Sequence, residues 1–307
     1  MGRLCFLPPT AYASRLRSED QFDIPAHYDM MVELDKDIHE NAELSASEVD
    51  LAIRLMGYVP QSVFLPCVGT GRHIPRLLEH GVERIVGVDV SPKNFRHAQH
   101  LVKGSDGVDI ILADLRAWES SERFDAVLLL GNSFGDLLDL KELRRFSASI
   151  TRPLRTHGTF VMDYIGTNYL AECENAQTKV WDVAIRGIPA LDSRIPRYDR
   201  NTGVMIIDVF VTRKDTTTLH PASPRVLWRG CYKKKVLNNR EVTELFDGLG
   251  DSHTRDTRVA LRLAGDAASL NPYYASMPMD KFGMLAKSTW WVGEAVATDH
   301  LYSFLWR

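Results

Sequence analysis

The sequence is poor in cysteine, has no long apolar run and carries no large excess of either charge. Its four cysteines are Cys5, Cys67, Cys173 and Cys231. Their wide spacing argues against a disulfide framework and against a zinc site. No apolar stretch approaches the length that crosses a membrane. A net charge of −3 over 307 residues gives no field that would attract a polyanion, so a nucleic-acid substrate is not expected.

The amino-terminal residues contain only a short apolar stretch, which Pro8 and Pro9 interrupt. That stretch is too brief for an export signal, and the cysteine spacing favours a reducing compartment. We therefore expect a cytoplasmic protein whose partners include neither a membrane nor a nucleic acid. The run of lysines at 233–235 is interpreted as a solvated strand face rather than as a track for phosphates.

The sequence does contain an alternation of short β-branched runs with helical stretches, which is typical of parallel strands joined by helical crossovers. The expected strands are 62–67, 84–90, 108–112, 124–130 and 159–165, and the expected helices are 73–80, 92–102 and 140–154. The run 126–130 is apolar on both faces, so it belongs in the middle of a covered sheet. The pattern predicts an α/β protein with a doubly wound, mostly parallel sheet.

Helix boundaries can be placed from capping residues. Ser45, with Glu48 three residues later, predicts the start of a helix that Gly57 ends. Asp139 and Glu142 predict another helix start in the same way. These signals place one helix before the first strand and one after the fourth.

The pattern changes after residue 173, because the strand-like stretches 180–185, 204–212 and 225–236 follow one another without intervening helices. Alternation of apolar residues within them is typical of an antiparallel sheet with one solvated face. We interpret this part as a lid inserted into the main domain. A helix at 240–249 and strands at 259–263 and 295–305 then bring the main sheet to seven strands.

Informative residues fall where the parallel strands end, which is where open α/β sheets bind ligands. Gly69 and Gly71 follow the first strand and allow a sharp turn and a close approach of a ligand. Asp89 ends the second strand, where a carboxylate can accept hydrogen bonds from a ribose diol. Asp114 ends the third strand and can accept a bond from an exocyclic amine, while Leu115 packs against a base. The fourth strand ends in polar groups at 131–133.

Each of these signals is weak alone, because a single aspartate is more often a helix cap or the start of a turn. Their occurrence in order, each at the end of its own strand, predicts an adenosine site. A dehydrogenase is disfavoured, because Arg72 and His73 follow Gly71 and the third glycine of the dinucleotide-binding motif is absent.

The run 63–164 resembles the class I S-adenosylmethionine-dependent methyltransferases. The resemblance rests on Gly-Thr-Gly at 69–71, Gly-Val-Asp-Val-Ser-Pro at 87–92, Ala-Asp-Leu-Arg at 113–116 and Gly-Asn-Ser-Phe at 131–134. The first and last are similar to the small-molecule branch, which includes glycine and amino-sugar N-methyltransferases and carries an antiparallel insertion after the fifth strand. Tyr28-Asp29 resembles the aromatic that closes over the cofactor's methionine end.

The resemblance implies a Rossmann-like fold, S-adenosylmethionine as cofactor and methyl transfer to a small molecule. It implies cofactor contacts from Tyr28, Cys67, Gly69, Gly71, Asp89, Val90, Asp114, Leu115, Gly131 and Asn132. The domains expected on this basis are an amino-terminal helical cap (1–57), a cofactor-binding core (58–172), an antiparallel lid (173–236) and a carboxy-terminal part of the core (237–307). The lid strands serve either the site or a homodimer contact.

The chain departs from the family in its first loop. Leu65 stands where the family has an acid, and Cys67 stands where it has its first glycine. Loss of the acid removes a charge-assisted contact of roughly 1.5–3 kcal/mol unless another group replaces it. Cys67 is compatible with the loop if its φ is negative and its side chain points away from the ligand. Three functions therefore stay open: methyl transfer, another reaction of the same cofactor (cyclisation or aminocarboxypropyl transfer), and a non-catalytic binding subunit.

Catalytic groups are expected above the fourth and fifth strand ends. The candidates are Tyr164, Tyr169 and His27, any of which could take a proton from an amine or hydroxyl, with packing as the alternative for the tyrosines. The pairs Trp290-Trp291 and Tyr273-Tyr274 form either an aromatic wall for a cation or part of the core. No cluster of histidines and carboxylates has the spacing of metal ligands, so no metal is expected.

Overall fold

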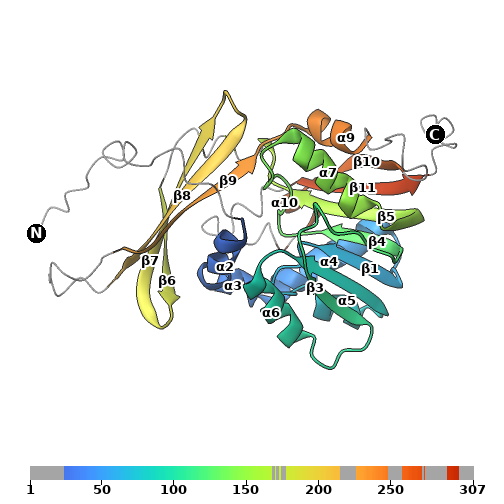
Figure 1. Cartoon of the computed structure of the whole chain (residues 1–307), viewed down its shortest axis with the longest axis horizontal. Helices are drawn as coiled ribbons and strands as arrows, with labels where there is room; N and C mark the ends of the chain where they lie inside the picture. The colour runs from blue at the N-terminus through green and yellow to red at the C-terminus, as the bar shows by residue number, and fades with distance from the viewer. Residues whose placement is uncertain are drawn as a thin grey trace, which may run out of the picture.

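The described part of the chain forms two β-sheets, and the helix α2 (Ile24–Leu34) lies between them (Figure 1). The computed structural model describes residues 24–167, 170, 173, 178–214, 226–247, 258–271, 273 and 289–296. The strands of the main sheet are β1 (Ser62–Pro66), β2 (Arg84–Asp89), β3 (Val108–Leu112), β4 (Phe124–Leu129), β5 (Leu154–Tyr164), β10 (Arg258–Asp266) and β11 (Thr289–Val296). The second sheet, which we call the insertion sheet, consists of β6 (Lys179–Ile185), β7 (Ile188–Asp199), β8 (Val204–Arg213) and β9 (Val226–Lys235).

The main sheet has seven strands in the order β10-β11-β5-β4-β1-β2-β3. The strands β1 to β5 are parallel, and β11 runs antiparallel to both of its neighbours. The strand order reverses between β1 and β4, so a crevice at their carboxyl ends is the position where such sheets bind ligands. The predicted fold class, a doubly wound sheet with an antiparallel insertion, is confirmed.

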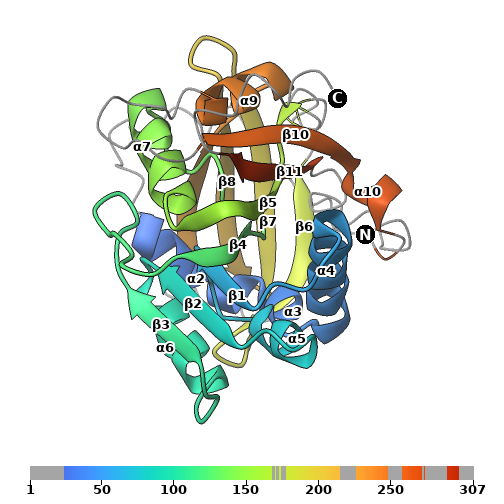
Figure 2. The same ribbon diagram turned by 90° about the vertical axis from the view of Figure 1, so that its right-hand side faces the viewer.

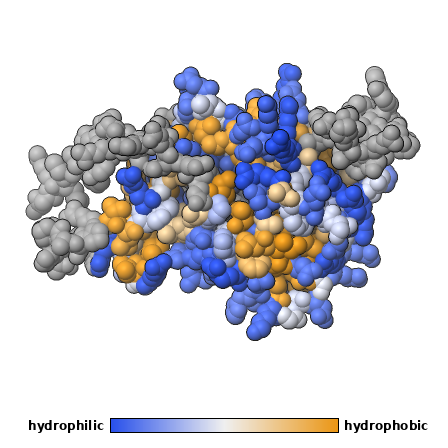
Figure 3. Space-filling view, in the orientation of Figure 1, coloured by the Kyte–Doolittle hydropathy of each residue, from blue (hydrophilic) through white to orange (hydrophobic). Residues whose placement is uncertain are grey.

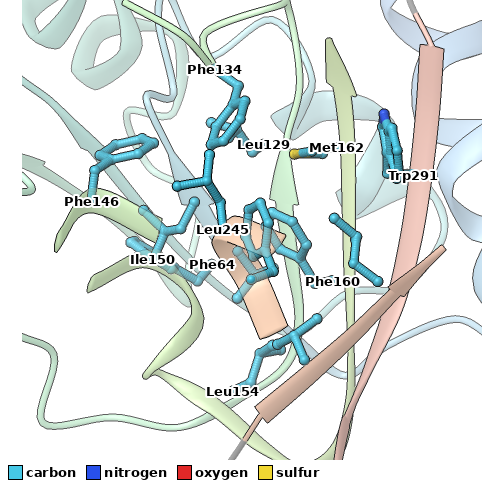
Figure 4. Close-up of a cluster of buried hydrophobic side chains, with 14 of the residues drawn as sticks. Phe64, Leu129, Phe134, Phe146, Ile150, Leu154, Phe160, Met162, Leu245 and Trp291 are labelled. Atoms are coloured by element: carbon cyan, nitrogen blue, oxygen red, sulfur yellow. The ribbon is translucent and has the colours of Figure 1, made fainter. Parts of the chain in front are cut away.

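Helices cover both faces of the main sheet (Figure 2). They are α4 (Ala42–Met56), α5 (Ile74–Glu79), α6 (Pro92–Leu101), α7 (Leu140–Thr151), α9 (Asn239–Asp247) and α10 (Ala267–Leu270), while α2 (Ile24–Leu34) and α3 (Lys36–His39) precede them. Side chains alternate along each strand, so β1 contributes to two cores. Phe64 packs in the core on the side of α7 and α9, which Figure 4 shows in close-up. Val63 and Leu65 pack in the core on the side of α4 and α5.

The insertion sheet lies in the chain between β5 and α9, and its strands are antiparallel in the order β6-β7-β8-β9. Alternate residues of β8, Met205 and Ile207 among them, are buried and share a core with Met31 and Leu34 of α2. The helix α2 therefore packs on the insertion sheet, and it also contacts α6 of the main domain. The helix α2 therefore connects the insertion sheet to the main domain.

Several expected boundaries are wrong. Asn41, not Ser45, caps α4, because its Oδ1 accepts a bond from the amide of Leu44 at 2.9 Å and the helix already contains Ser45. The strand β7 was not predicted, because prolines such as Pro196 interrupt the apolar alternation. The last strand begins at Thr289 rather than 295, and the helix expected to reach 154 ends at 151, where β5 soon begins.

Candidate active site

A cavity of about 310 Å³ lies at the carboxyl ends of β1 to β4. Its lining comes from the loops after these four strands, from α2 and α3, from α7, and from β7, β8 and β9 of the insertion sheet. The predicted residues that line it are His27, Tyr28, Cys67, Gly69, Asp89, Val90, Asp114, Leu115, Gly131 and Asn132. The fold therefore brings together residues from four strand ends and from the amino-terminal helix, as the sequence order suggested.

The loop after β1 is held by a carboxylate from β2. The Gly69 amide donates to Oδ2 of Asp89 at 2.7 Å, and the Ser91 amide donates to Oδ1 at 2.9 Å. Asp89 is 6% exposed, and burial raises the pKa of its carboxyl while these backbone bonds lower it. Each oxygen of a carboxylate can accept more than one hydrogen bond, so Asp89 is held in a fixed position and can still accept from hydroxyls.

Gly71 is the one predicted glycine that does not line the cavity. Its φ is +82°, and a Cβ placed on it would lie 3.2 Å from Cβ of Ala98 in α6. The residue therefore serves the turn and the close approach of α6 to the loop. Gly69, with a φ of +60°, turns the chain beside Asp89.

Asp114 lies at the rim of the cavity and is paired with Arg116. The guanidinium Nη2 donates to Oδ2 at 2.6 Å and Nε donates to Oδ1 at 3.0 Å. These hydrogen bonds lower the pKa of the Asp114 carboxyl. The adjoining apolar wall consists of Val90, Ala113, Leu115, Leu137, Leu143 and Phe146. The arrangement suits a flat apolar ring with a polar edge.

Cys67 has a φ of +55°, so the expectation of a negative φ is wrong. The chain turns sharply as β1 ends, and this position takes the left-handed conformation that a glycine would adopt, at a cost of roughly 1–2 kcal/mol. The Cys67 side chain packs against the core on the side of α7. Burial and the nearby Asp89 carboxylate raise the pKa of its thiol well above the ordinary value.

Leu65, which stands where the family has an acid, is buried in the core on the side of α4 and α5. Arg72 lines the cavity, and a Cβ on Gly131 would lie 3.7 Å from its Nη2. Its Nη1 lies 2.5 Å from Oε2 of Glu48 on α4, and Nε2 of His73 lies 2.7 Å from the same oxygen. Burial raises the pKa of Glu48, but Arg72 and His73 outweigh it and lower the pKa to about 2. Sequence reasoning missed this cluster; the run Arg72-His73 was its only signal.

The loop after β4 is fixed through Asn132. The residue has a φ of +60°, its amide donates to Oδ1 of Asp163 at 3.0 Å, and its Oδ1 accepts from the Ile165 amide at 2.7 Å. Burial raises the pKa of Asp163 to about 7, with a further contribution from Glu48. The Asn132 side chain thus joins the ends of β4 and β5 at the floor of the cavity.

The helix α2 forms the wall opposite the strand ends. The Tyr28 hydroxyl donates to Oδ2 of Asp136, and the ring of His27 stacks in parallel on Tyr232 of β9 at 4.9 Å between centroids. Burial lowers the pKa of His27 to about 4, so its ring is neutral at neutral pH. Asp29 attaches α2 to the start of α6, because its Oδ1 accepts from the Ser91 hydroxyl at 2.5 Å and from the Lys93 amide at 3.0 Å.

The insertion sheet contributes a charged and an apolar part to the cavity. Arg194 of β7 lies between two carboxylates, 2.6 Å from Oδ1 of Asp35 and 2.8 Å from Oδ2 of Asp192. Ile207 and Val209 of β8 line the cavity beside it. Strands β7 and β8, which belong to the predicted lid, therefore form walls of the cavity.

Of the remaining candidates, Tyr164 lies outside the cavity. Its hydroxyl donates to the Lys235 carbonyl at 2.7 Å and accepts from the Leu237 amide at 2.8 Å, and burial raises its pKa. The structure thus gives Tyr164 a packing role. Tyr169 lies outside the described residues. Within the described ranges, no group of three or more histidines, cysteines and acids could hold a metal ion.

Trp290 and Trp291 are buried in cores on opposite faces of the main sheet, so they do not form one aromatic wall. Tyr273 packs against the core on the side of α4, and Tyr274 lies outside the described residues. Among the described helices, none is both long and apolar enough to cross a membrane.

Comparison with known proteins agrees with this geometry. Residues 65–158 match the family described as a methyltransferase domain. A glycine/sarcosine N-methyltransferase of Parasynechococcus marenigrum (strain WH8102) is 30% identical over 163 residues, which is 51% of this chain and 56% of that protein. The chain thus aligns with little more than half the length of this curated relative.

Solved structures resemble most of the chain. An S-adenosylmethionine-dependent methyltransferase from Clostridium acetobutylicum has a TM-score of 0.60 at 10% identity, covering 88% of this chain and 96% of that one. A sugar N-methyltransferase from Streptoalloteichus has a TM-score of 0.58 at 16% identity, covering 83% and 88%. An amino pentose methyltransferase from Micromonospora echinaspora, solved with S-adenosylmethionine, has a TM-score of 0.56 at 15% identity, covering 81% and 89%. The resemblance seen in the sequence is confirmed at the level of domain family and fold.

Proposed function

We propose that this chain, whose residues 65–158 form a methyltransferase domain of the class I fold, transfers a methyl group from S-adenosylmethionine to nitrogen or oxygen of a small molecule. One observation carries the proposal. The Asp89 carboxylate holds the Gly69 amide and faces the same cavity as the apolar wall beside Asp114. A carboxylate, a glycine loop and an apolar slot in this order suit an adenosine.

The adenosine half of the cofactor is assigned to β2 and β3. Asp89 accepts hydrogen bonds from the two ribose hydroxyls while it keeps the loop in place. The adenine lies between Val90 and Leu115, and its amine donates to Asp114. Asp114 has lone pairs beyond those that bind Arg116, so the two donors share one carboxylate.

The methionine half is assigned to Arg72 and the backbone near Gly131. A guanidinium beside the loop suits the carboxylate of an amino acid, and Glu48 holds that guanidinium in place. This assignment explains how the chain tolerates Leu65: the contact at the methionine end is made to the carboxylate through Arg72 instead of to the ammonium through an acid. Cys67 contributes its backbone only.

The bound cofactor would supply an electrophilic methyl group on a positively charged sulfur. The chain's own residues align the acceptor with that methyl group and exclude water, using Tyr28, Tyr232 and the apolar side chains of β8. His27 lines the cavity with a neutral ring and is the candidate to receive a proton from the acceptor, as a weak base because burial lowers its pKa to about 4. Tyr164 takes no part, because both hydrogen bonds of its hydroxyl go to the backbone.

No observation favours cyclisation, aminocarboxypropyl transfer or a non-catalytic subunit over methyl transfer. The cytoplasmic location and the absence of a nucleic-acid partner stay predictions. A homodimer through the insertion sheet also stays a prediction; it is supported by the apolar side chains that Figure 3 shows over this sheet, where Val180 is 51% exposed.

The test is to incubate the purified protein with S-adenosylmethionine alone and then with amines, phenols and amino acids, and to follow the products by mass spectrometry. S-adenosylhomocysteine that forms only with an acceptor supports the proposal. Methylthioadenosine without an acceptor supports another reaction of the cofactor, and calorimetric binding without turnover supports a binding subunit. The Asp89→Asn variant is the control that should lose the product.

A further inference from the structure

One lysine of the insertion sheet is buried at the back of the candidate site. Lys234 is the second residue of the run 233–235, and its exposed fraction is 0%, whereas Lys233 and Lys235 are partly exposed. The expectation of a solvated face is therefore wrong for Lys234. Side chains alternate along β9, so Lys234 points toward the main sheet and Lys233 points away from it. A buried ammonium needs an anion and hydrogen-bond acceptors, so its partners identify its role.

The ammonium of Lys234 binds the loop after β4 at three points. Its Nζ donates to the carbonyl of Asn132 and to the carbonyl of Phe134 at 3.0 Å, and it lies 2.8 Å from Oδ1 of Asp136. The Lys235 amide adds a bond to the Gly135 carbonyl at 2.6 Å. The loop is thus bound to β9 at four of its residues, Asn132, Phe134, Gly135 and Asp136.

The same ammonium is linked to α2 through Asp136. The other carboxylate oxygen of Asp136 accepts the hydrogen bond of the Tyr28 hydroxyl. Tyr232, two residues before Lys234 on the same strand, presents its ring 5.6 Å from Nζ and stacks on His27. Tyr28, His27 and Tyr232 all line the cavity. One charge therefore joins the strand-end loop, the amino-terminal helix and the insertion sheet.

We propose that Lys234 is a positioning residue that sets the methionine end of the site, by holding the loop 131–136 and, through Asp136, the hydroxyl of Tyr28. This inference rests on the proposed function, which assigns the methionine part of the cofactor to that loop and the adenosine part to Asp89 and Asp114. Lys234 has no contact with either of those aspartates among its hydrogen bonds and ion pairs. Its loss should disturb one half of the cofactor site and spare the other.

Two compounds separate the halves, because S-adenosylhomocysteine and methylthioadenosine share the adenosine and only the first has the amino-acid part. We expect Lys234→Met to weaken calorimetric binding of S-adenosylhomocysteine by about tenfold or more and to leave methylthioadenosine within about twofold. A lysine that only stabilised the fold would change neither affinity in the folded fraction, or both alike. The affinity for S-adenosylhomocysteine divided by the affinity for methylthioadenosine is therefore the diagnostic ratio, and Lys234→Met should lower it.

Three further variants keep the test decisive if Lys234→Met folds poorly. Lys234→Arg should recover part of the ratio, because it keeps the charge, and Asp136→Asn should lower it with Lys234 in place. Lys233→Met is the matched control and should leave both affinities unchanged. An unchanged ratio in Lys234→Met or Asp136→Asn overturns the inference. A wild-type chain that binds neither compound overturns the proposed function first, and the inference with it.

Discussion

At the scale of single residues, the cavity depends on side chains that hold the backbone of the strand-end loops in place. Asp89 accepts from the amides of Gly69 and Ser91 with different oxygens, so the glycine loop cannot move without moving this carboxylate. Asn132 connects the ends of β4 and β5 in the same manner. Each of these side chains forms hydrogen bonds to more than one segment, so even an isosteric change breaks a bond that holds a loop of the cavity.

Asp89→Asn should weaken binding of S-adenosylhomocysteine by about ten- to a hundredfold, since hydrogen bonds to a charged group contribute roughly 1.5–3 kcal/mol each. The amide nitrogen of the new asparagine would also face an N–H donor from Gly69 or Ser91. Isothermal titration calorimetry measures the change. Asp109→Asn, an exposed aspartate of β3 paired with Arg84, is the control and should bind as the wild type does. Equal affinities for Asp89→Asn and the control would exclude the assigned role.

The pairing of Glu48 with Arg72 and His73 predicts that the stability of the fold falls at acid pH. Its pKa is about 2 in the folded chain against an ordinary value of 4.5, so it stabilises the fold above about pH 4.5 and the contribution is lost as pH falls toward 2. The size of this contribution is about 3 kcal/mol. Glu48→Gln leaves Arg72 buried without its anion, so it should cost about 3 kcal/mol at neutral pH.

The measurement is urea unfolding of both proteins between about pH 6 and about pH 3. The gap in unfolding free energy between the wild type and Glu48→Gln should narrow as the pH falls. Glu79→Gln, which alters an exposed carboxylate paired with Arg76, should show no such narrowing. A gap that stays constant over this range would contradict the pairing of Glu48 with Arg72.

At this scale, sequence order predicted the carboxylates better than the cations. Asp89 and Asp114 were found because each ends its own strand, and the ends of parallel strands meet at one edge. Arg72 was not assigned to the cavity, nor Lys234 to the loop after β4, because their roles depend on partners far along the chain, Glu48 and Asp136. A run of charged residues gives no local signal that one of them is buried. The φ of Cys67 was likewise set by the turn and not by residue type.

At the scale of elements, α2 determines how the cavity is closed. It packs on the insertion sheet through Met31 and Leu34, and it reaches α6 through Asp29 and through the ion pair of Glu33 with Lys93. Few of its contacts are with the main sheet itself. This helix is therefore expected to open more easily than the strands whose ends it covers.

Asp29→Ala should increase amide hydrogen exchange in α2 by about fivefold, because it removes two hydrogen bonds to the start of α6, each contributing roughly 0.5–1.5 kcal/mol. The measurement is hydrogen–deuterium exchange followed by mass spectrometry on peptides from residues 24–34. Exchange in β1 and β4 should not change. Glu40→Ala, which removes an exposed partner of Lys36, provides the comparison and should leave α2 as in the wild type. If α2 exchanged at the same rate in Asp29→Ala as in Glu40→Ala, the hydrogen bonds of Asp29 would not be what holds α2 in place.

Elements with strong periodicity were predicted well. The parallel strands β1 to β4 and the helix start at Asp139 agree with expectation within a residue or two, because apolar runs and a capping aspartate specify them locally. The strand β7 was missed, since Pro189, Pro196 and several charged residues interrupt its pattern, and its place is set by pairing with β6 and β8. The helix α4 was found, but its first turn was misplaced because Asn41 competed with Ser45 as the cap.

At the scale of the whole molecule, two sheets contribute walls to one cavity. Its walls come from residues as distant in the chain as His27 and Tyr232. A compound that fills it contacts the main domain, α2 and the insertion sheet together, so binding should stabilise the molecule as a unit. The pairing of Arg194 with Asp35 adds a direct connection between the insertion sheet and the amino-terminal helical region.

S-adenosylhomocysteine should raise the temperature of thermal unfolding by about 4 °C at a concentration near a hundred times its dissociation constant, where linkage predicts about 2.7 kcal/mol and the unfolding entropy is about 2 cal/mol/K per residue. Differential scanning calorimetry at several concentrations measures the shift, which should grow with the logarithm of concentration. Asp89→Asn should need more ligand for the same shift. NAD⁺ is the negative control, because the loop lacks the third glycine of a dinucleotide site.

The cavity's division between two sheets has a practical consequence for engineering. Ile207 and Val209 of β8 reach the cavity but lie outside the assigned adenosine slot and outside the contacts of Lys234. Libraries randomised at these two codons would vary which acceptor is accommodated while Asp89 and Asp114 stay unchanged, so selectivity could be evolved in the laboratory without first rebuilding the nucleoside pocket.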